Sequence, residues 1–218
     1  MEHTQTPLLE VSDLSVSFRM YGSGLEQRQL PVISSLSLRV LPGEILAVAG
    51  SSGSGKSLLA SAILGILPGN ATVSGALQFD GEPLTPERQA RLRGTEIALV
   101  PQSVAFLDPL MKVGAQADGH RKPRPTEARR ALFRQLGLPE QTERLYPFQL
   151  SGGMARRVLV STALLSEARL IIADEPTPGM CLEQAEEALS MFRAMADAGK
   201  GVVLITHDID LAFHIADR

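Results

Sequence analysis

Residues 44–64, EILAVAGSSGSGKSLLASAIL, hold a candidate strand, a glycine-rich loop and a candidate helix in one short stretch. The run from Glu44 to Gly50 is almost wholly apolar, which is typical of a strand buried on both faces of a sheet. Beyond the loop, apolar side chains return at helical spacing at Leu58, Leu59, Ala62, Ile63 and Ile66. A buried strand that leads into a helix is the repeating unit of parallel α/β folds, so this stretch predicts that class.

The loop itself, GSSGSGKS from Gly50 to Ser57, matches the pattern G-x-x-x-x-G-K-S between a strand and a helix. Its glycines let the backbone curl so that N–H groups face phosphate oxygens. Lys56 can reach the β- and γ-phosphates, and the Ser57 hydroxyl can bind Mg²⁺. The sequence therefore predicts a nucleotide-phosphate site made by Gly50, Ser51, Ser52, Gly53, Ser54, Gly55, Lys56, Ser57 and Leu58.

The rest of the chain continues the alternation of apolar strands and amphipathic helices. We therefore expect a P-loop NTPase core with a mainly parallel sheet and right-handed crossovers. Before this core, residues 8–18 and 32–40 alternate apolar and polar side chains around a glycine-rich polar stretch. This pattern predicts an N-terminal antiparallel β subdomain.

Residues 103–148 differ from the core in composition, with scattered prolines and a helical pattern in 126–138. We expect a small helical insert, in which Thr126 caps a helix at its start and Gly137 follows its end. The predicted division is one domain, 1–218, with the core and antiparallel part in 1–102 and 149–218 and a helical subdomain in 103–148.

The composition excludes several classes of protein. The net charge is −3 and aromatic residues make up 4% with no tryptophan, which argues against a general nucleic-acid binder. The single cysteine allows no internal disulfide, so a reducing, cytoplasmic setting is expected. No apolar run approaches the roughly 20 residues of a membrane-spanning helix. The basic cluster HRKPRPTEARR, residues 120–130, is interpreted as a solvated face.

Polar residues follow three further apolar strands. Asp174 and Glu175 end LIIADE, His207 ends VVLITH, and Gln102 follows IALVP. The carboxyl ends of parallel strands form the binding edge of an open sheet, so these side chains are expected beside the phosphate loop. There Asp174 suits a contact to Mg²⁺, Glu175 can polarise a water molecule, and His207 can hold the γ-phosphate. Gln102 can reach the metal ion or the water.

A second glycine-containing stretch, QLSGGMARRV, runs from Gln149 to Val158. Ser151, Gly152 and Gly153 stand where a helical pattern begins, and the free N–H groups of a helix start favour an anion. Since the first loop is already a complete phosphate site, this second site needs a separate explanation.

Taken together, GSSGSGKS, Gln102, LSGGM, LIIADE and His207 resemble, in order and spacing, the ATPase subunit of an ABC transporter. The resemblance extends from Leu8 to Arg218. The stretches LYPFQLSGGMARRV and LGILP look most like the peptide and nickel importer branch of that family.

The resemblance implies that two cassettes stack head to tail around two ATP molecules, so Ser151, Gly152 and Gly153 would complete the partner's site. It implies ATP and Mg²⁺ as cofactors, with the metal held by Ser57, Gln102 and Asp174. Glu175 would be the general base, assisted by His207 and Lys56, and Phe18, with Tyr21 as second choice, would stack on adenine.

The resemblance also implies partners and a place in the cell. Expected partners are a second ATPase subunit, transmembrane permease subunits and an extracytoplasmic solute-binding protein, with no nucleic acid. The chain would sit on the cytoplasmic face of the membrane and power import of a nickel or metal chelate or a peptide. The helical insert and the Gln102 loop would dock on the membrane subunits.

The sequence departs from the family pattern at three residues and at its end. Cys181 stands where the family usually has aspartate, and Pro178 where it has a small polar residue or alanine. Arg156 replaces a glutamine of the signature helix and is expected to add donors near the phosphates. The family continues past Arg218 with further strands, so the resemblance implies a domain truncated at the C-terminus.

Three other interpretations stay open beside the importer ATPase. A degenerate nucleotide-binding partner in a heterodimeric pair is favoured by Cys181 and disfavoured by Glu175 and His207. An ABC ATPase acting on nucleic acid or ribosomes typically has a second cassette or a long coiled-coil insert, and neither occurs in this sequence. A small-molecule kinase does not explain LSGGM or His207. We take the importer ATPase as the prediction and the degenerate partner as the alternative.

Overall fold

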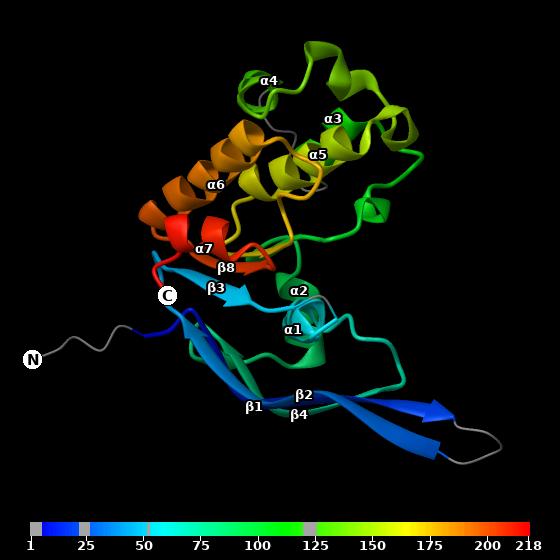
Figure 1. Cartoon of the computed structure of the whole chain (residues 1–218), viewed down its shortest axis with the longest axis vertical. Helices are drawn as coiled ribbons and strands as arrows, with labels where there is room; N and C mark the ends of the chain where they lie inside the picture. The colour runs from blue at the N-terminus through cyan, green and yellow to red at the C-terminus, as the bar shows by residue number, and fades with distance from the viewer. Residues whose placement is uncertain (1–5, 22–26, 52, 120–125) are drawn as a thin grey trace, which may run out of the picture.

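The computed structural model of the chain describes residues 6–21, 27–51, 53–119 and 126–218. Within these ranges the strands form two sheets, with helices between the sheets and beyond the upper one (Figure 1). The mixed arrangement confirms the predicted α/β class with a parallel sheet and an antiparallel part.

The parallel sheet carries the carboxyl-terminal edge that the sequence predicted. Its strand order is β3-β8-β7-β6, and every pairing is parallel. The strands are β3 (Ile45–Ala49), β6 (Ile97–Val100), β7 (Leu170–Asp174) and β8 (Gly201–Thr206). Their carboxyl ends therefore lie together at one edge of the sheet.

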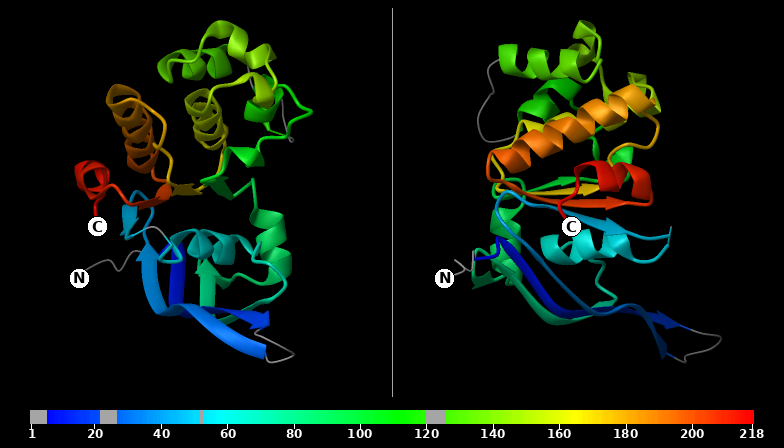
Figure 2. Two further views of the ribbon diagram at one scale, coloured as in Figure 1. Left: turned by 45° about the vertical axis from the view of Figure 1, so that its right-hand side comes forward. Right: turned by 60° about the vertical axis from the view of Figure 1, so that its left-hand side comes forward.

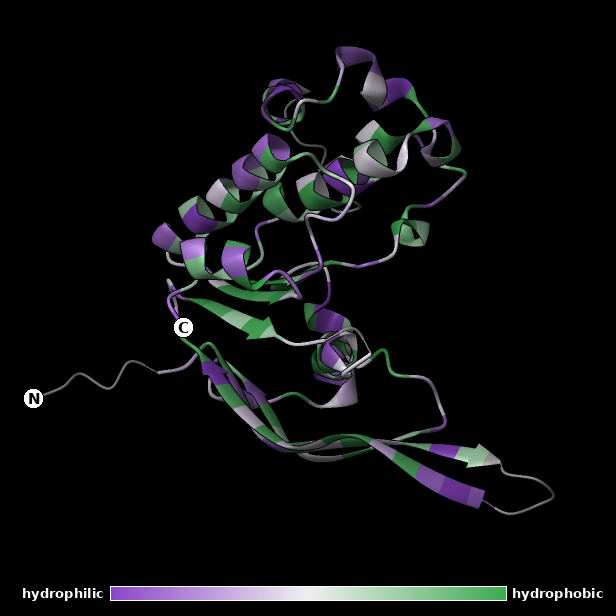
Figure 3. Cartoon of the chain, in the orientation of Figure 1, coloured by the Kyte–Doolittle hydropathy of each residue, from purple (hydrophilic) through white to green (hydrophobic). Residues whose placement is uncertain are grey.

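The antiparallel sheet lies below, in the order β2-β1-β4-β5. Its strands are β1 (Leu9–Tyr21), β2 (Gln27–Val40), β4 (Ala71–Phe79) and β5 (Glu82–Pro83). Figure 3 shows polar residues along the far part of the β1–β2 hairpin, which projects from the body of the molecule, and apolar residues near the core. The predicted antiparallel β subdomain is present.

Helices occupy both faces of the parallel sheet, as Figure 2 shows from two sides. α1 and α2 lie between the two sheets, and α5, α6 and α7 lie on the opposite side. The bounds are α1 (Lys56–Leu64), α2 (Pro86–Leu92), α5 (Gly152–Leu164), α6 (Leu182–Asp197) and α7 (Ile209–Ile215).

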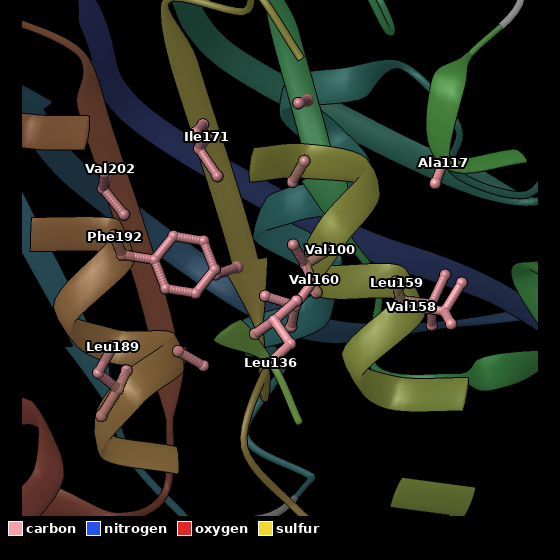
Figure 4. Packing of buried hydrophobic residues seen from close by; sticks show 14 of the residues in the cluster. Val100, Ala117, Leu136, Val158, Leu159, Val160, Ile171, Leu189, Phe192 and Val202 are labelled. Atoms are coloured by element: carbon pink, nitrogen blue, oxygen red, sulfur yellow. The ribbon is translucent and has the colours of Figure 1, made fainter. Parts of the chain in front are cut away.

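The parallel sheet divides two hydrophobic clusters because successive side chains of a strand point to opposite faces. On β7, Ile171 belongs to the upper cluster with α5 and α6, whereas Ile172 belongs to the lower cluster with α1 and the antiparallel sheet. Figure 4 shows the upper cluster, in which Phe192 of α6 lies near Ile171 and Val202. Burial on both faces explains why these strands are continuous apolar runs.

Residues 103–148, called the helical segment below, contain helices, 3₁₀ turns and loops but no strand among their described residues. These are η1 (Val104–Phe106), α3 (Val113–Asp118), α4 (Thr126–Gln135) and η2 (Glu140–Arg144), followed by η3 (Pro147–Gln149). Gly137 has φ +62° just beyond α4, and the Leu138 N–H donates to the Phe133 carbonyl at 2.8 Å, as in a glycine C-terminal cap. Thr126 is the first residue of α4 rather than the residue before it.

The interpretation of the basic cluster as a solvated face is wrong for part of it. Residues 120–125 lie outside the described residues, but Arg129 is almost buried and pairs with Asp118 and Glu143. Arg130 also pairs with Glu143, at 2.7 Å. The arginines therefore join α3, α4 and η2, because a charged side chain that loses water must find an opposite charge.

The structure extends two predicted strands and adds one helix, α2, that the sequence pattern did not indicate. The strands β1 and β2 run further into the polar stretch than expected, with Tyr21 opposite Gln27. Pairing between β1 and β2 stabilises the strands there, although their side chains are mostly polar. α2 was missed because only Gln89 and Leu92 are buried on it, and Gln89 caps the end of α1 through the carbonyls of Ala62 and Ile63.

The last described residues lie along β3. The Asp217 N–H donates to the Ile45 carbonyl at 2.9 Å, and the Ala47 N–H donates to the Arg218 carbonyl at 2.8 Å. Among the residues that the structure describes, no helix has both the length and the apolar character needed to cross a membrane.

Candidate nucleotide-binding site

The phosphate loop joins β3 to α1 and has the backbone that its glycines predict. Gly53 and Gly55 have φ +82° and +90°, values that L side chains rarely adopt. A Cβ at Gly55 would lie 2.9 Å from Val32 Cγ1, so β2 packs directly against the loop. Apart from its chain neighbours, no described residue has a heavy atom within 4 Å of a Cβ built at Gly53. This open glycine backbone at the start of a helix fits a phosphate group.

Lys56 is the first residue of α1 and lies over the loop. Its Nζ donates to the Gly50 carbonyl at 2.7 Å and to the Ser51 carbonyl at 2.8 Å. The ammonium group is therefore at the mouth of the loop, where a phosphate would meet it. Ser52 lies outside the described residues, so its predicted contact is not described.

Asp174 ends β7 beside the loop. Its side chain is buried, and its Oδ1 has no hydrogen-bond partner among the described residues. Burial raises the pKa of Asp174 above the usual value, while a hydrogen bond from the Ser57 hydroxyl and the charge of Lys56 oppose that rise. An orphaned carboxylate oxygen next to a serine hydroxyl fits Mg²⁺, which takes oxygen ligands and completes its shell with water and phosphates.

No group of three or more histidine, cysteine, aspartate or glutamate side chains in the described part of the chain could hold a metal ion. Ser57 and Asp174 supply oxygen donors at this edge, and oxygen is the ligand atom that Mg²⁺ prefers.

Glu175 and His207 meet across the ends of β7 and β8. The Glu175 Oε2 and the His207 Nδ1 are 2.8 Å apart. The carboxylate is buried, with 7% of its side chain exposed, whereas the imidazole is 57% exposed. Glu175 has φ +50°, and its N–H donates to the Ile205 carbonyl at 2.9 Å. Such strain in a non-glycine residue is typical of functional sites, and it aims the carboxylate at His207.

Gln102 is exposed and lies just beyond β6. Its carbonyl and the carbonyl of Pro101 both accept hydrogen bonds from Arg156 of α5. Arg156 was expected to add donors near the phosphates, but both terminal nitrogens of its guanidinium are used on this backbone. Burial lowers the pKa of Arg156, and the charges of Asp174 and Glu175 oppose that effect.

The signature stretch opens α5. Ser151 is the N-cap, and its Oγ accepts a hydrogen bond from the Met154 N–H at 3.3 Å. Outside its own helix turn, no described residue has a heavy atom within 4 Å of a Cβ built at Gly152, whereas a Cβ at Gly153 would lie 2.6 Å from the Gly179 carbonyl oxygen. The loop after Glu175 therefore packs on the first turn of the signature helix and allows no side chain at Gly153.

Two of these features were missed by sequence reasoning. The sequence offers a clue to the contact between Gly153 and Gly179, because both residues are glycines in loops that carry predicted site residues. It offers none to the Arg156 contact, because the acceptors there are main-chain carbonyls that no residue pattern records.

The model of the family described as "ABC transporter" matches residues 33–178, which include the phosphate loop, Gln102, the signature and both carboxylates. The chain belongs to the ABC transporter family. The match confirms the resemblance to the ABC transporter family, and it spans more than half of the chain.

Curated ABC transporter proteins extend the likeness over nearly the whole chain. The oligopeptide transport ATP-binding protein OppD of Mycobacterium tuberculosis is 36% identical over 98% of this chain and 36% of its own length. OppD of Bacillus subtilis is 32% identical over 98% of this chain and 63% of its own length. The chain thus spans about a third of the first of these relatives. The narrower expectation of a peptide-importer-like ABC sequence is confirmed.

Solved ABC cassettes share the fold. A dimeric post-hydrolysis state of the ATP-binding cassette MJ0796 bound to ADP and Pi has a TM-score of 0.79 and 25% identity, covering 94% of this chain and 90% of that one. An ATP-binding subunit of an ABC transporter has a TM-score of 0.76 and 28% identity, covering 96% and 83%.

The structure describes Cys181, a residue that departs from the pattern expected of ABC cassettes, and Phe18, the residue predicted to contact adenine. Cys181, in place of aspartate, is exposed and is the N-cap residue of α6, but its side chain makes no capping hydrogen bond. Phe18 is partly buried against the lower cluster, opposite Leu30 and Ala71. Its stacking on adenine stays a prediction, and the side chain of Tyr21 lies outside the described residues.

Proposed function

We propose that this chain binds and hydrolyses ATP as the nucleotide-binding subunit of an ABC importer. The observation that carries the proposal is the 2.8 Å contact between Glu175 and His207 at the strand edge beside the phosphate loop. It joins a carboxylate able to accept a proton from water to a group able to hold a phosphate. The relatives named for oligopeptide transport support a peptide as the cargo, with nickel or another metal chelate as the second candidate.

Each group of site residues would have a separate role in phosphoryl transfer. Gly50 to Ser57 would hold the phosphates through backbone N–H groups, with Lys56 offsetting their charge. Ser57, Asp174 and Gln102 would hold Mg²⁺, which supplies positive charge to the phosphate oxygens when bound. Glu175 would take the proton of the attacking water. His207 would orient both the Glu175 carboxylate and the γ-phosphate.

The signature residues are proposed to act on a second cassette. Ser151, Gly152 and Gly153 would complete the ATP site built on the partner's phosphate loop, in a head-to-tail dimer. The open space at Gly152 supports this, since a phosphate needs close access to the helix start. ATP would favour the closed dimer, and hydrolysis would remove the γ-phosphate that keeps it closed.

We further propose that the helical subdomain, 103–148, joins the core, 1–102 and 149–218, to membrane subunits on the cytoplasmic face. A cleft of about 460 Å³ lies between α1, β6 and the helical segment. Phe106 and Leu107 line it from the helical segment, and Leu110 close by is 88% exposed. An apolar cleft with exposed apolar neighbours suits a short helix of a permease. A solute-binding protein would complete the importer.

The test is ATP turnover by the purified chain, alone and with a candidate partner cassette. Glu175→Gln keeps the size of the side chain and should lower turnover about 100-fold or more, because a general base contributes about 10²–10⁴. Nucleotide binding in this variant should persist. Turnover equal to that of the parent would remove Glu175 as the base. ATP binding without turnover in any pairing would favour the degenerate partner instead.

A further inference from the structure

Two neighbouring arginines of α5 reach in different directions. Arg156 donates from Nη1 to the Pro101 carbonyl at 2.8 Å and from Nη2 to the Gln102 carbonyl. Arg157 donates from Nη1 to the carbonyls of Leu136 and Gly137, both at 2.9 Å. Each guanidinium thus holds two successive carbonyls, and Arg157 also donates from Nε to the Gly153 carbonyl of its own helix at 3.2 Å. The two side chains are equally buried, with 8% of each residue exposed.

The carbonyls that accept hydrogen bonds from the two arginines lie in different parts of the chain. The carbonyls of Leu136 and Gly137 lie at the end of α4, within the helical segment. The carbonyls of Pro101 and Gln102 lie where the chain leaves β6 for that segment. The chain returns toward the core through α5, so Arg156 links the outgoing connection to the returning one. Arg157 makes no such link.

The connection at Pro101 depends on this contact. Pro101 has no N–H to donate, and the paired region of β6 ends at Val100. The side chain of Gln102 is exposed, whereas its carbonyl is held by Arg156. The main chain is therefore fixed at the point from which the Gln102 amide extends.

The burial of Arg156 makes the contact strong. Its Nε has no partner among the described residues, so its charge is met by the two carbonyls and by the nearby Asp174 and Glu175. A lysine could donate to one carbonyl but could not match both with a planar fork.

We propose that Arg156 is a positioning residue, which fixes the Pro101–Gln102 main chain to the signature helix so that the Gln102 amide is presented to the phosphate site from one place. The contact itself is a property of the nucleotide-free chain. Its effect on catalysis rests on the proposed ATPase function.

Hydrogen exchange of the nucleotide-free chain tests the contact. Arg156→Lys keeps the charge and removes the fork, so exchange of the amides in 102–107 should become about tenfold faster. Arg157→Lys is the matched control on the same helix, and its faster exchange should fall in 133–138 instead. Arg156→Gln is a second variant, and circular dichroism shows whether each one folds.

Steady-state kinetics tests the role. Arg156→Lys should lower kcat about tenfold while the KM for ATP changes less than about threefold, because a residue that only supported the fold would not separate the two constants. In a Gln102→Ala background the same change should have less than about a twofold effect on kcat, since the effect passes through Gln102.

Unchanged exchange in 102–107 for Arg156→Lys would overturn the proposal, and so would an effect on kcat that is fully additive with Gln102→Ala. A parent chain without ATP turnover would contradict the proposed function alone. The exchange experiment needs no nucleotide and would then decide by itself whether Arg156 holds the connection.

Discussion

The parallel sheet and the helical segment both bury apolar side chains, and the helical segment adds a cluster of ion pairs. Every residue of β7 is buried, and its side chains meet apolar residues on both faces of the sheet. The helical segment contributes buried apolar residues such as Phe133 and Leu136 to the upper cluster, and it also contains ion pairs among Asp118, Arg129, Arg130 and Glu143. Apolar burial is nearly independent of pH, whereas ion pairs are lost when a carboxylate is protonated.

This difference matters because the two regions carry different parts of the candidate site. Asp174 and Glu175 lie on the sheet, and the signature residues lie on α5, which contacts both regions. Conditions that loosen only the helical segment should therefore leave the carboxylates and the phosphate loop in place.

The largest effect is expected from Phe192→Ala in the upper cluster. Phe192 is fully buried on α6 and faces the sheet near Ile171 and Val202 (Figure 4). Its truncation should lower the free energy of unfolding by about 3–5 kcal/mol, because it removes apolar contacts and leaves a cavity. Urea unfolding followed by circular dichroism measures this. Phe213→Ala is the control, since Phe213 is 82% exposed on α7 and should change little.

A smaller and local effect is expected from Glu143. A hydrogen bond from Arg130 and a weaker effect of the one from Arg129 lower the pKa of Glu143 from 4.5 to about 2. Because the folded-state pKa is depressed, the stabilisation is complete above pH 4.5 and is lost as the pH falls toward about 2. Glu143→Gln removes the charge at neutral pH and should destabilise the helical segment by about 2 kcal/mol, after allowance for solvent screening.

Hydrogen exchange at pH 7 checks this, because it reports on each region separately. Protection of α4 should fall in Glu143→Gln while protection of β7 stays at the parent level. Equal loss in both regions would mean that they unfold as one unit, and the contrast between them would not hold.

The sequence predicted the sheet better than the helical segment, and the reason is physical. A strand buried on both faces must be apolar throughout, so β7 and β8 could be recognised without knowing their neighbours. The residues at their ends follow from topology, because parallel strands bring Asp174, Glu175 and His207 to one edge.

The remaining features depend on partners that are distant in sequence. In the sequence, Arg129 belongs to a basic run that is interpreted as solvated. In the structure, it forms ion pairs with Asp118 and Glu143. Gln89 looked like an ordinary polar residue, although it caps α1 from 26 or 27 residues away. Side chains that bind main-chain carbonyls leave no pattern that a sequence can show.

The smallest expected effect is a gain in stability from Cys181→Asp. Cys181 is the N-cap of α6, with extended backbone (φ −72°, ψ 163°) and no capping hydrogen bond. An aspartate there can accept from the free N–H groups of the first turn and favours the positive end of the helix. We expect about 1 kcal/mol, which corresponds to a rise of about 2–4 °C in Tm for a chain of this size.

Thermal unfolding of Cys181→Asp, Cys181→Ser and Cys181→Ala separates capping from other causes. Serine should give part of the gain because it caps as well, and alanine should give none because it accepts no hydrogen bond. A gain with alanine would show instead that the exposed thiol itself lowers the measured Tm. Since α6 packs on β8, α5 and α7, the gain should persist in the Glu143→Gln background. Its loss there would mean that the two regions are coupled through the start of α6.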